Sequence, residues 1–234
     1  MIKTILFDLD GTLLPMNQED FIKAYFGLLA KKVSLYGYNP DTLIKTIWQG
    51  ISNMIKNDGK ETNEAVFWKT FENIYGTEAL KDKFIFDEFY SKEFQDVSKS
   101  CGYTTYAKEI IEKVKGKGYK LVLATNPIFP SIATESRMRW AGINPSDFEV
   151  YTTYENSHHS KPNLQYYKDI LGKIGCRADE CLMVGNDVDE DMIASSLGMK
   201  TFLLTDCLIN KSNKDISDYD KGSYVDLLNY FDEI

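Results

Sequence analysis

The sequence predicts an α/β protein, with a doubly wound parallel sheet (Rossmann-like) as its core and an inserted helical cap domain. From about residue 106 onward, short apolar runs of strand length alternate with segments of helical spacing. Strands separated by helices imply a parallel sheet covered on both faces. Residues 16–97 instead carry apolar residues at helical spacing with few strand signals. We therefore expect a core of residues 1–15 and 98–234 and a helical cap of residues 16–97.

The first strand, expected over residues 2–7, runs into two acids, Asp8 and Asp10. Side chains alternate along a strand, so the two carboxylates can start on the same side. At the carboxyl end of a strand in an α/β sheet, that side opens into the ligand crevice. Neighbouring carboxylates repel each other unless a proton or cation intervenes, and a divalent metal suits their oxygens. This pattern favours a metal-assisted site over a plain Asp-Gly turn.

Four helices are expected in the cap. The first begins at Asn17 or Asp20, and the third opens at Thr62, because these residues can cap a helix. The fourth covers about residues 78–97, which are rich in phenylalanine. Breaks between the helices are predicted at Gly37 and Pro40, at Asp58 and Gly59, and at Gly76.

In the rest of the chain, helices and strands are expected in alternation. The helices cover about residues 106–116, 131–140, 163–171, 190–197 and 225–231. The strands cover about residues 119–124, 148–152, 181–184 and 200–204. The polar stretch 210–221 is expected to be a loop.

Further polar residues follow these strands or precede these helices: Thr125-Asn126, Ser160-Lys161-Pro162, and Gly185-Asn186-Asp187 with Asp191. With the first acid pair they supply a small hydroxyl, a lysine and an acid cluster. A nucleophile, phosphate-binding groups and a magnesium site are what phosphoryl transfer requires.

In order and spacing these residues resemble the four motifs of the haloacid dehalogenase-like hydrolases: Asp8-Leu9-Asp10-Gly11-Thr12, Thr125-Asn126, Lys161-Pro162 and Gly185-Asn186-Asp187 with Asp191. The resemblance spans residues 2–204. In that family a helical cap inserted after the first motif closes over the active site and helps to select substrate. Phosphatases and phosphomutases of the family carry Asp at the position of Asp10, whereas the dehalogenase and phosphonatase branches do not. The resemblance therefore implies phosphate-ester chemistry.

The resemblance also implies a role for each residue. Asp8 is the expected nucleophile, which would form an aspartyl-phosphate. Asp10 would protonate the leaving-group oxygen and later deprotonate the attacking water. Thr125 and Asn126 would hold phosphoryl oxygens, and Lys161 would supply positive charge for the transferring group.

Mg²⁺ is the expected cofactor. Its ligands would be Asp8, the backbone carbonyl of Asp10 and Asp187, with Asn186 and Asp191 in support. Many members of the family carry Asp where this chain has Asn186, and others place the important acid one residue later. The main ligand position is therefore left open between Asn186 and Asp187.

Asp189 and Glu190 are expected to be solvated acids at a helix start, where the helix dipole favours them. The run from Asp187 onward also resembles the start of a calcium-binding loop. That loop needs Gly at its sixth position and an acid at its twelfth, where Met192 and Gly198 stand here. We therefore reject a calcium loop.

A receiver domain of a two-component system is another possible interpretation, because it also combines an acid pair, a phosphorylated Asp, a Thr and a Lys. Its phosphorylated Asp would end a middle strand, but the strand here ends in Thr125, and the large helical insertion also disfavours a receiver domain.

The adjacent histidines have two possible places. His158 and His159 either edge the mouth of the active site or belong to a surface loop.

Composition limits the partners and the compartment. The 234-residue chain has 27 Lys and Arg against 35 Asp and Glu, a net charge of −8, which argues against nucleic-acid or anionic-membrane partners. No apolar run approaches the roughly 20 residues that span a bilayer. The four cysteines lack paired or zinc-like spacing, and we expect no signal peptide. These features predict a cytoplasmic protein. The resemblance implies a small phosphorylated metabolite as the substrate, and we expect a monomer or weak homodimer.

The expected function is magnesium-dependent hydrolysis of a small phosphate monoester through an aspartyl-phosphate. One alternative is a phosphomutase of the β-phosphoglucomutase type, which returns the phosphoryl group to a sugar. Another is a non-catalytic sensor of a phosphate ligand. The sensor is disfavoured because a binding protein has no use for Asp10 as an acid.

Overall fold

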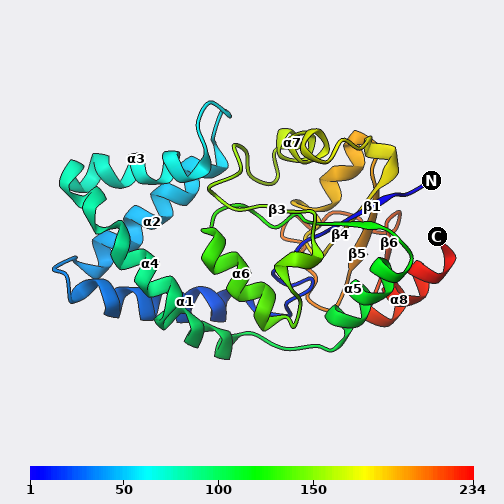
Figure 1. Cartoon of the computed structure of the whole chain (residues 1–234), viewed down its shortest axis with the longest axis horizontal. Helices are drawn as coiled ribbons and strands as arrows, with labels where there is room; N and C mark the ends of the chain where they lie inside the picture. The colour runs from blue at the N-terminus through cyan, green and yellow to red at the C-terminus, as the bar shows by residue number, and fades with distance from the viewer.

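A six-stranded sheet, parallel throughout, forms the centre of the computed structural model, which describes all residues 1–234. The strand order is β3-β2-β1-β4-β5-β6 (Figure 1). The strands are β1 (Thr4–Phe7), β2 (Lys120–Leu123), β3 (Val150–Tyr151), β4 (Cys181–Gly185), β5 (Lys200–Leu204) and β6 (Asp220–Gly222). The chain order reverses between β1 and β4, and such a switch point is where open α/β sheets bind ligands. The predicted doubly wound sheet is confirmed.

Register aligns the ends of the central strands. Phe7, the last residue of β1, pairs with Leu123 of β2 on one side and with Val184 of β4 on the other. The residues that follow these three strands therefore meet at one edge of the sheet, where the sequence carries its polar motifs.

Helices cover both faces of the sheet. Alternate residues of β1 point to opposite faces: Ile5 and Phe7 belong to one hydrophobic cluster and Leu6 to another. The first cluster is completed by α5 (Tyr106–Gly116) and α8 (Tyr224–Glu233). The second is completed by α7 (Leu164–Ile174) and the 3₁₀ helix η5 (Met192–Leu197). The short 3₁₀ helices η3 (Pro145–Asp147) and η4 (Ala178–Glu180) lie in connections between these elements.

Between β1 and β2 the chain forms a helical block, which we define as residues 18–100 and which lies beside the sheet, on the left of Figure 1. Its elements are α1 (Gln18–Ser34), α2 (Pro40–Ile55), α3 (Asn63–Tyr75), η1 (Thr77–Asp82), α4 (Lys83–Ser91) and η2 (Glu93–Ser100). Asn17 caps α1, because its side chain accepts the backbone N–H groups of Glu19 and Asp20. Thr62 caps α3 in the same way.

The core of the helical block is a cluster of 17 buried residues that is rich in aromatic side chains. One member, Ala133, comes from α6 (Ser131–Trp140), which lies between the block and the sheet in Figure 1. Polar bonds join the same elements: Gln95 of η2 donates to Ser136 Oγ at 2.9 Å and accepts from the Trp140 indole at 3.3 Å. The helical block therefore shares its packing with a helix of the sheet domain.

Three expected elements differ in the structure. The fourth helix, expected over residues 78–97, is divided among η1, α4 and η2, and the break at Lys92 lets Phe89, Tyr90 and Phe94 all contact Tyr25. The helix expected over 190–197 is the 3₁₀ helix η5. The expected loop 210–221 contains most of β6, which was missed because its polar, exposed residues give no strand pattern.

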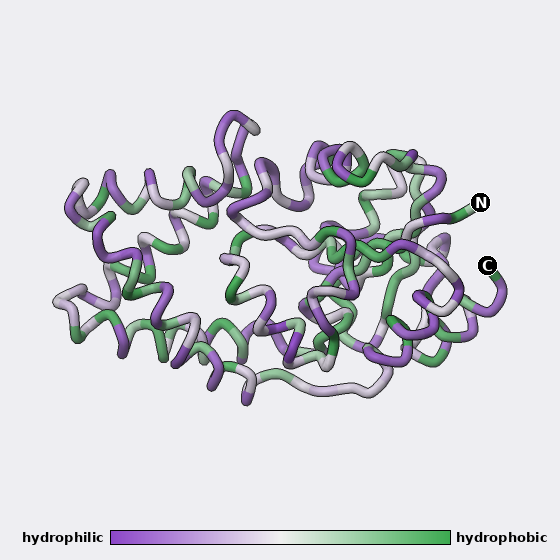
Figure 2. Tube along the Cα trace, in the orientation of Figure 1, coloured by the Kyte–Doolittle hydropathy of each residue, from purple (hydrophilic) through white to green (hydrophobic).

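Figure 2 shows hydrophobic stretches along the central strands and mixed hydropathy along the helices, as expected for a sheet buried on both faces. No helix has both the length and the apolar composition that crossing a membrane requires.

Candidate active site

A buried lysine joins two aspartates at the switch point. Lys161 Nζ donates to Asp8 Oδ1 at 2.8 Å and to Asp191 Oδ1 at 2.6 Å. Lys161 and Asp191 are each 1% exposed, and Asp8 is 7% exposed. Burial alone would lower the pKa of Lys161, but the carboxylates of Asp191 and Asp8 raise this pKa well above its usual value. The ammonium therefore stays charged beside Asp8.

The turn after β1 fixes Asp8 next to the end of β4. Thr12 Oγ1 lies 3.3 Å from Asp8 Oδ2 and 3.0 Å from Asn186 Oδ1, so one hydroxyl connects the two motifs. Gly11 makes this approach possible: its φ is +87°, and a Cβ there would overlap the Asn186 side chain. The amide nitrogen of the Asn186 side chain is fixed as well, because this Nδ2 donates to the Cys207 carbonyl at 2.7 Å.

Asp10 is paired with a residue that the sequence analysis missed. The guanidinium of Arg137, on α6, forms an ion pair with Asp10 Oδ2, while Asp10 Oδ1 is buried and has no hydrogen-bond partner. Arg137 is fully buried and lies 4.4 Å from the centre of the Phe129 ring. Burial raises the pKa of Asp10, and the charge of Arg137 opposes that rise.

Hydrogen bonds to its backbone and side chains fix the loop that follows β2. The carbonyl of Thr125 accepts from the Thr152 hydroxyl at 2.6 Å and from the Tyr166 hydroxyl at 2.8 Å. Asn126 Nδ2 donates to Glu190 Oε2 at 3.0 Å, and Asn126 Oδ1 is buried without a partner. These bonds fix the backbone that carries both predicted phosphate-binding residues.

The acid cluster after β4 folds into a tight turn. Asp187 Oδ1 accepts the backbone N–H groups of Asp189 and Glu190 at 2.8 and 2.9 Å. Asp191 Oδ2 accepts the N–H of Asp187 at 3.0 Å, and burial raises the pKa of Asp191. Asp189 pairs with Lys214 at the surface, at 2.7 Å.

The prediction of a solvated acid is wrong for Glu190. The turn points Glu190 toward Asn126 at the edge of the pocket, where its side chain is partly buried, and burial raises the pKa of Glu190. In a sequence, an acid within a run of acids indicates the solvated start of a helix. Only the three-dimensional structure of the turn distinguishes Glu190 from Asp189.

A side chain of the helical block contacts two of the loops that carry predicted site residues. Asn63, at the start of α3, is fully buried. Its Nδ2 donates to the Pro127 carbonyl at 3.1 Å and to Ser160 Oγ at 3.0 Å. Pro127 follows the Thr125-Asn126 motif, and Ser160 precedes Lys161. Sequence reasoning missed Asn63, because an Asn after a capping Thr gives no signal of a long-range role.

Eight of the polar residues described above line one pocket of about 360 Å³. Its polar floor consists of residues that follow the sheet strands: Asp8, Asp10, Thr125, Asn126, Asn186, Asp187, Glu190 and Asp191. Lys161 lies behind Asp8 and does not itself line the pocket. The structure thus brings all predicted site residues together.

The donor set of this pocket fits magnesium. No three or more His, Cys, Asp or Glu side chains are grouped so that they could hold a metal ion by themselves. Mg²⁺, however, is typically held by one or two carboxylates and keeps water and substrate oxygens as its other ligands. Asp8 and Asp10 line the pocket, and the buried Asp10 Oδ1 has no partner within the protein.

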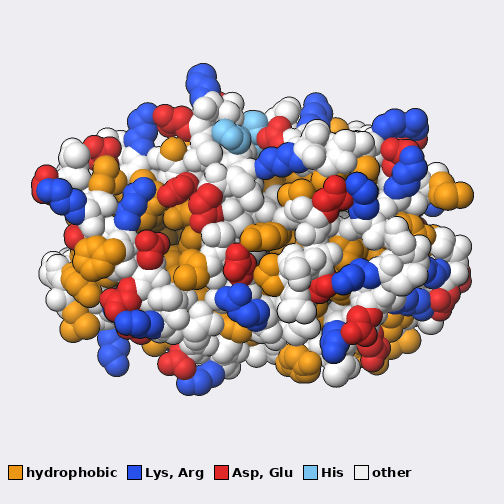
Figure 3. Space-filling view, viewed as in Figure 1, with side chains coloured by type: hydrophobic (Ala, Val, Ile, Leu, Met, Phe, Trp, Pro, Cys, Tyr) orange, Lys and Arg blue, Asp and Glu red, His pale blue; other side chains and the backbone are white.

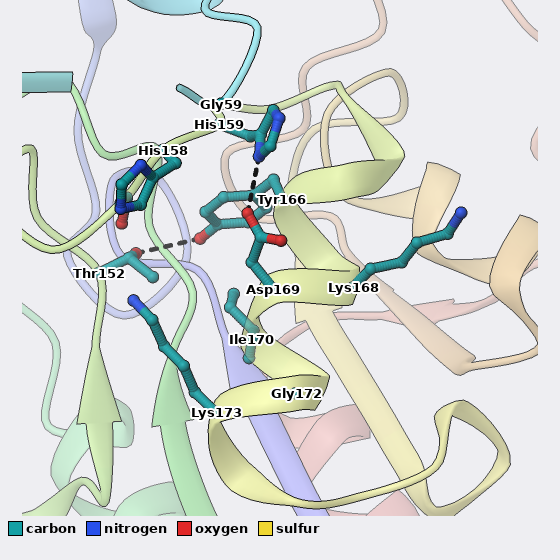
Figure 4. Close-up of a pocket in the computed structure, with 11 residues that line it drawn as sticks. Gly59, Thr152, His158, His159, Tyr166, Lys168, Asp169, Ile170, Gly172 and Lys173 are labelled. Atoms are coloured by element: carbon teal, nitrogen blue, oxygen red, sulfur yellow. Dashed lines mark hydrogen bonds and ion pairs between the residues drawn. The ribbon is translucent and has the colours of Figure 1, made fainter. Parts of the chain in front are cut away.

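A second pocket, of about 550 Å³, lies beside α7 and contains both histidines (Figure 4). His159 Nδ1 lies 2.7 Å from Asp169 Oδ2, and the His159 ring packs against Gly59 of the helical block. None of the predicted catalytic residues lines this pocket. The histidines therefore do not edge the active-site mouth, and the surface-loop alternative describes them better.

An acid pair, a threonine, a lysine and an acid cluster at the switch point of a parallel sheet define a hydrolase of the phosphoryl-transfer class. The chain belongs to the haloacid dehalogenase-like hydrolases, whose family model matches residues 5–204. The resemblance inferred from the motifs is thereby confirmed.

Two curated relatives are phosphatases. A glyceraldehyde 3-phosphate phosphatase of Methanocaldococcus jannaschii is 28% identical over 228 residues, covering 96% of this chain and 92% of that protein. A phosphoglycolate phosphatase of Aquifex aeolicus is 26% identical over 233 residues, covering 99% and 97%. With Asp10 in the acid position, we identify the chain as a phosphoric monoester hydrolase of this family.

Solved structures agree on the fold. A 2-haloacid dehalogenase from Pseudomonas syringae matches with a TM-score of 0.65 at 19% identity, covering 100% of this chain and 99% of that chain. At this identity the likeness concerns the fold alone.

Proposed function

We propose that this protein is a magnesium-dependent phosphatase that hydrolyses a small phosphate monoester through an aspartyl-phosphate on Asp8. The observation that carries the proposal is the contact of Lys161 with Asp8, a residue that lines the same pocket as Asp10. The cation offsets the repulsion between a carboxylate nucleophile and an anionic substrate.

The proposed reaction has two displacements. The Asp8 carboxylate attacks phosphorus, the bond to the ester oxygen breaks, and Asp10 gives its proton to that oxygen. Asp10 then takes a proton from water, which attacks the phosphorus and releases inorganic phosphate and free Asp8. Burial raises the pKa of Asp10, which favours the protonated form needed in the first displacement, and the charge of Arg137 opposes that rise.

Thr125 and Asn126 would bind the phosphoryl oxygens, because both line the pocket on a loop with a fixed backbone. Lys161 would orient Asp8 and balance charge as the phosphoryl group is transferred. Asp191 would hold the Lys161 ammonium in place through the 2.6 Å contact.

Mg²⁺ would be held by Asp8, the backbone carbonyl of Asp10 and Asp187, supported by Asn186 and Asp191. When bound, the metal would supply positive charge to the phosphoryl oxygens. Asn186 competes with Asp187 for the main ligand position, since its side chain is joined to Asp8 through Thr12.

Residues 16–97 would form the cap domain and residues 1–15 with 98–234 the catalytic domain. In support, side chains of α1 and α2 line the same pocket as the proposed catalytic acids.

We also propose a monomer or weak homodimer in a reducing cytoplasm, where the four free cysteines would be stable. The similarity to a glyceraldehyde 3-phosphate phosphatase and a phosphoglycolate phosphatase supports a small phosphorylated substrate.

One experiment separates this function from its alternatives. The protein is incubated with Mg²⁺ and a panel of phosphate esters, and free phosphate and sugar-phosphate isomers are both assayed. Multiple-turnover phosphate release is expected. Isomer formation with little free phosphate would instead indicate the mutase. Tight ester binding with neither product would indicate the sensor.

A further inference from the structure

The wall of the active-site pocket opposite the acids is apolar. Eleven of the 21 residues that line the pocket are hydrophobic. Seven of these come from α1 and α2 of the helical block: Phe21, Ile22, Tyr25, Phe26, Trp48, Ile51 and Ile55. A substrate whose phosphoryl group lies on the acid floor would therefore present its alcohol part to this wall.

The same pocket is poor in available positive charge. Lys211 is its only cationic lining residue. It is exposed to solvent, and it lies in the loop that also contains Ile209, whose backbone bonds to the Asn186 turn. Arg137 is buried behind Phe129 and paired with Asp10, while Lys161 is paired with Asp8 and Asp191. The helical-block wall itself offers no cation to a second anionic group on the substrate.

Part of the apolar wall lies open to solvent. Ile22, Trp48 and Ile55 are 36%, 44% and 39% exposed, and they are among the few large hydrophobic side chains exposed on this protein. The Trp48 ring lies 5.4 Å from that of Phe26. On the face shown in Figure 3, hydrophobic side chains lie over both the helical block and the sheet domain, so it is the exposure of Ile22, Trp48 and Ile55 that demonstrates apolar surface at the pocket rim. A ligand that covers these side chains removes apolar surface from water, which favours binding.

From the apolar wall, its exposed rim and the lack of a cation on it, we propose that the substrate is a phosphate monoester of an uncharged, predominantly apolar alcohol. The inference rests on the proposed phosphatase function. The alkyl or aryl group of the alcohol packs against the α1 and α2 side chains while the phosphoryl group meets Asp8. A carboxylate or second phosphate at the same place gives up part of its hydration to apolar side chains and gains no cationic partner from the wall.

Matched esters test the proposal directly. Benzyl phosphate and 4-carboxybenzyl phosphate have leaving groups of the same kind and differ in one remote charge. With Mg²⁺ present, kcat/KM is expected to be at least about tenfold higher for benzyl phosphate. In a series of linear alkyl phosphates, kcat/KM is expected to rise about threefold to fourfold per added methylene while the chain still contacts the wall.

Charge variants test whether the α1 and α2 wall causes the preference. Ile55→Lys puts a cation on the rim of the pocket, and Ile74→Lys puts one on α3 outside the pocket at a similarly exposed site of 46%. Ile55→Lys is expected to reduce the preference for benzyl phosphate by about tenfold, and Ile74→Lys to leave it unchanged. Trp48→Lys provides a second rim variant, and thermal unfolding verifies that each variant is folded.

The outcomes separate the two proposals. Hydrolysis of 4-carboxybenzyl phosphate as fast as benzyl phosphate, or an equal effect of Ile74→Lys, overturns the substrate class and leaves the phosphatase intact. If no ester is hydrolysed, the phosphatase proposal fails. Calorimetry with benzylphosphonate and 4-carboxybenzylphosphonate then still measures the preference of the pocket. Tighter binding of the charged phosphonate, or binding of neither, overturns the substrate class.

Discussion

The guanidinium of Arg137 forms an ion pair with the carboxylate of Asp10, although 127 positions separate them in the chain. Arg137 also donates to Thr134 Oγ1 at 3.3 Å and to the Ala133 carbonyl at 3.4 Å within its own helix. These bonds leave the guanidinium little freedom. The carboxylate that we assign to acid–base catalysis is therefore positioned by α6 rather than by its own loop alone.

Arg137→Gln should lower kcat by about tenfold or more and change KM much less, since general acid–base groups contribute about 10²–10⁴ to rate when well positioned. Steady-state kinetics on the best ester measures both parameters. Arg139→Gln, which removes a 53% exposed arginine from the same helix, is the control and should leave kcat unchanged. A purely structural role of Arg137 would instead appear as a loss of thermal stability without a selective loss of kcat.

Asp8→Asn should abolish turnover, because loss of a nucleophile can cost on the order of 10⁶ in rate. Lys161 keeps its contact with Asp191, so the variant should remain folded. Acid quenching of the wild type during turnover, followed by mass spectrometry, should find a phosphoryl group on Asp8. Asp189→Asn is the control acid at the surface. More than a few per cent of activity left in Asp8→Asn would contradict the aspartyl-phosphate mechanism.

Chelation should stop activity, and added Mg²⁺ should restore it. Asp187→Asn keeps an oxygen able to accept the N–H groups of Asp189 and Glu190 but removes a charge. We expect the Mg²⁺ concentration for half-maximal activity to rise by about tenfold or more, the scale seen for metal-site changes. Asn186→Ala is the competing test. If it produces the larger shift, Asn186 holds the main ligand position.

Gly11→Ala should destabilise the protein more than Gly37→Ala. The two glycines have nearly the same φ, +87° and +86°, but only Gly11 faces a side chain, that of Asn186. The difference in unfolding free energy between the variants should be about 1–3 kcal/mol, the range for overpacking. Urea titrations measure it. If both variants lost the same unfolding free energy, the Asn186 side chain would be able to move away from the new Cβ without cost.

Glu88 should make stability depend on pH. Hydrogen bonds from Lys32 and then Lys92 lower the pKa of Glu88 to about 2. Its pKa in the unfolded chain is about 4.3, so the interaction stabilises the fold above that value and is lost as pH falls toward 2. Wild type should exceed Glu88→Gln in melting temperature at neutral pH and lose that advantage in strong acid. Glu112→Gln, an exposed acid on α5, serves as the control.

The sequence was informative wherever a local rule determines structure. Strand ends followed by polar motifs located Asp8, Thr125 and Asn186, because parallel strands bring their carboxyl ends to one edge. Capping chemistry located the starts of α1 and α3 at Asn17 and Thr62.

Contacts between distant segments escaped prediction. Arg137 and Asn63 look like ordinary helical residues, since their partners are determined by how α6 and α3 pack against the sheet domain. β6 forms by pairing with β5 and has no pattern of its own. Glu190 differs from Asp189 only through the turn that aims it at Asn126.

Asn63 would couple movement of the proposed cap domain to the binding of substrate. Its amide bonds to Pro127 and Ser160, so separating the helical block from the sheet domain would release the loops that carry Thr125 and Lys161 together. If closure orders both loops for phosphate, then phosphate must favour closure by the same free energy, because linkage is reciprocal. The affinity for substrate and the position of the cap would then be linked by one coupling free energy.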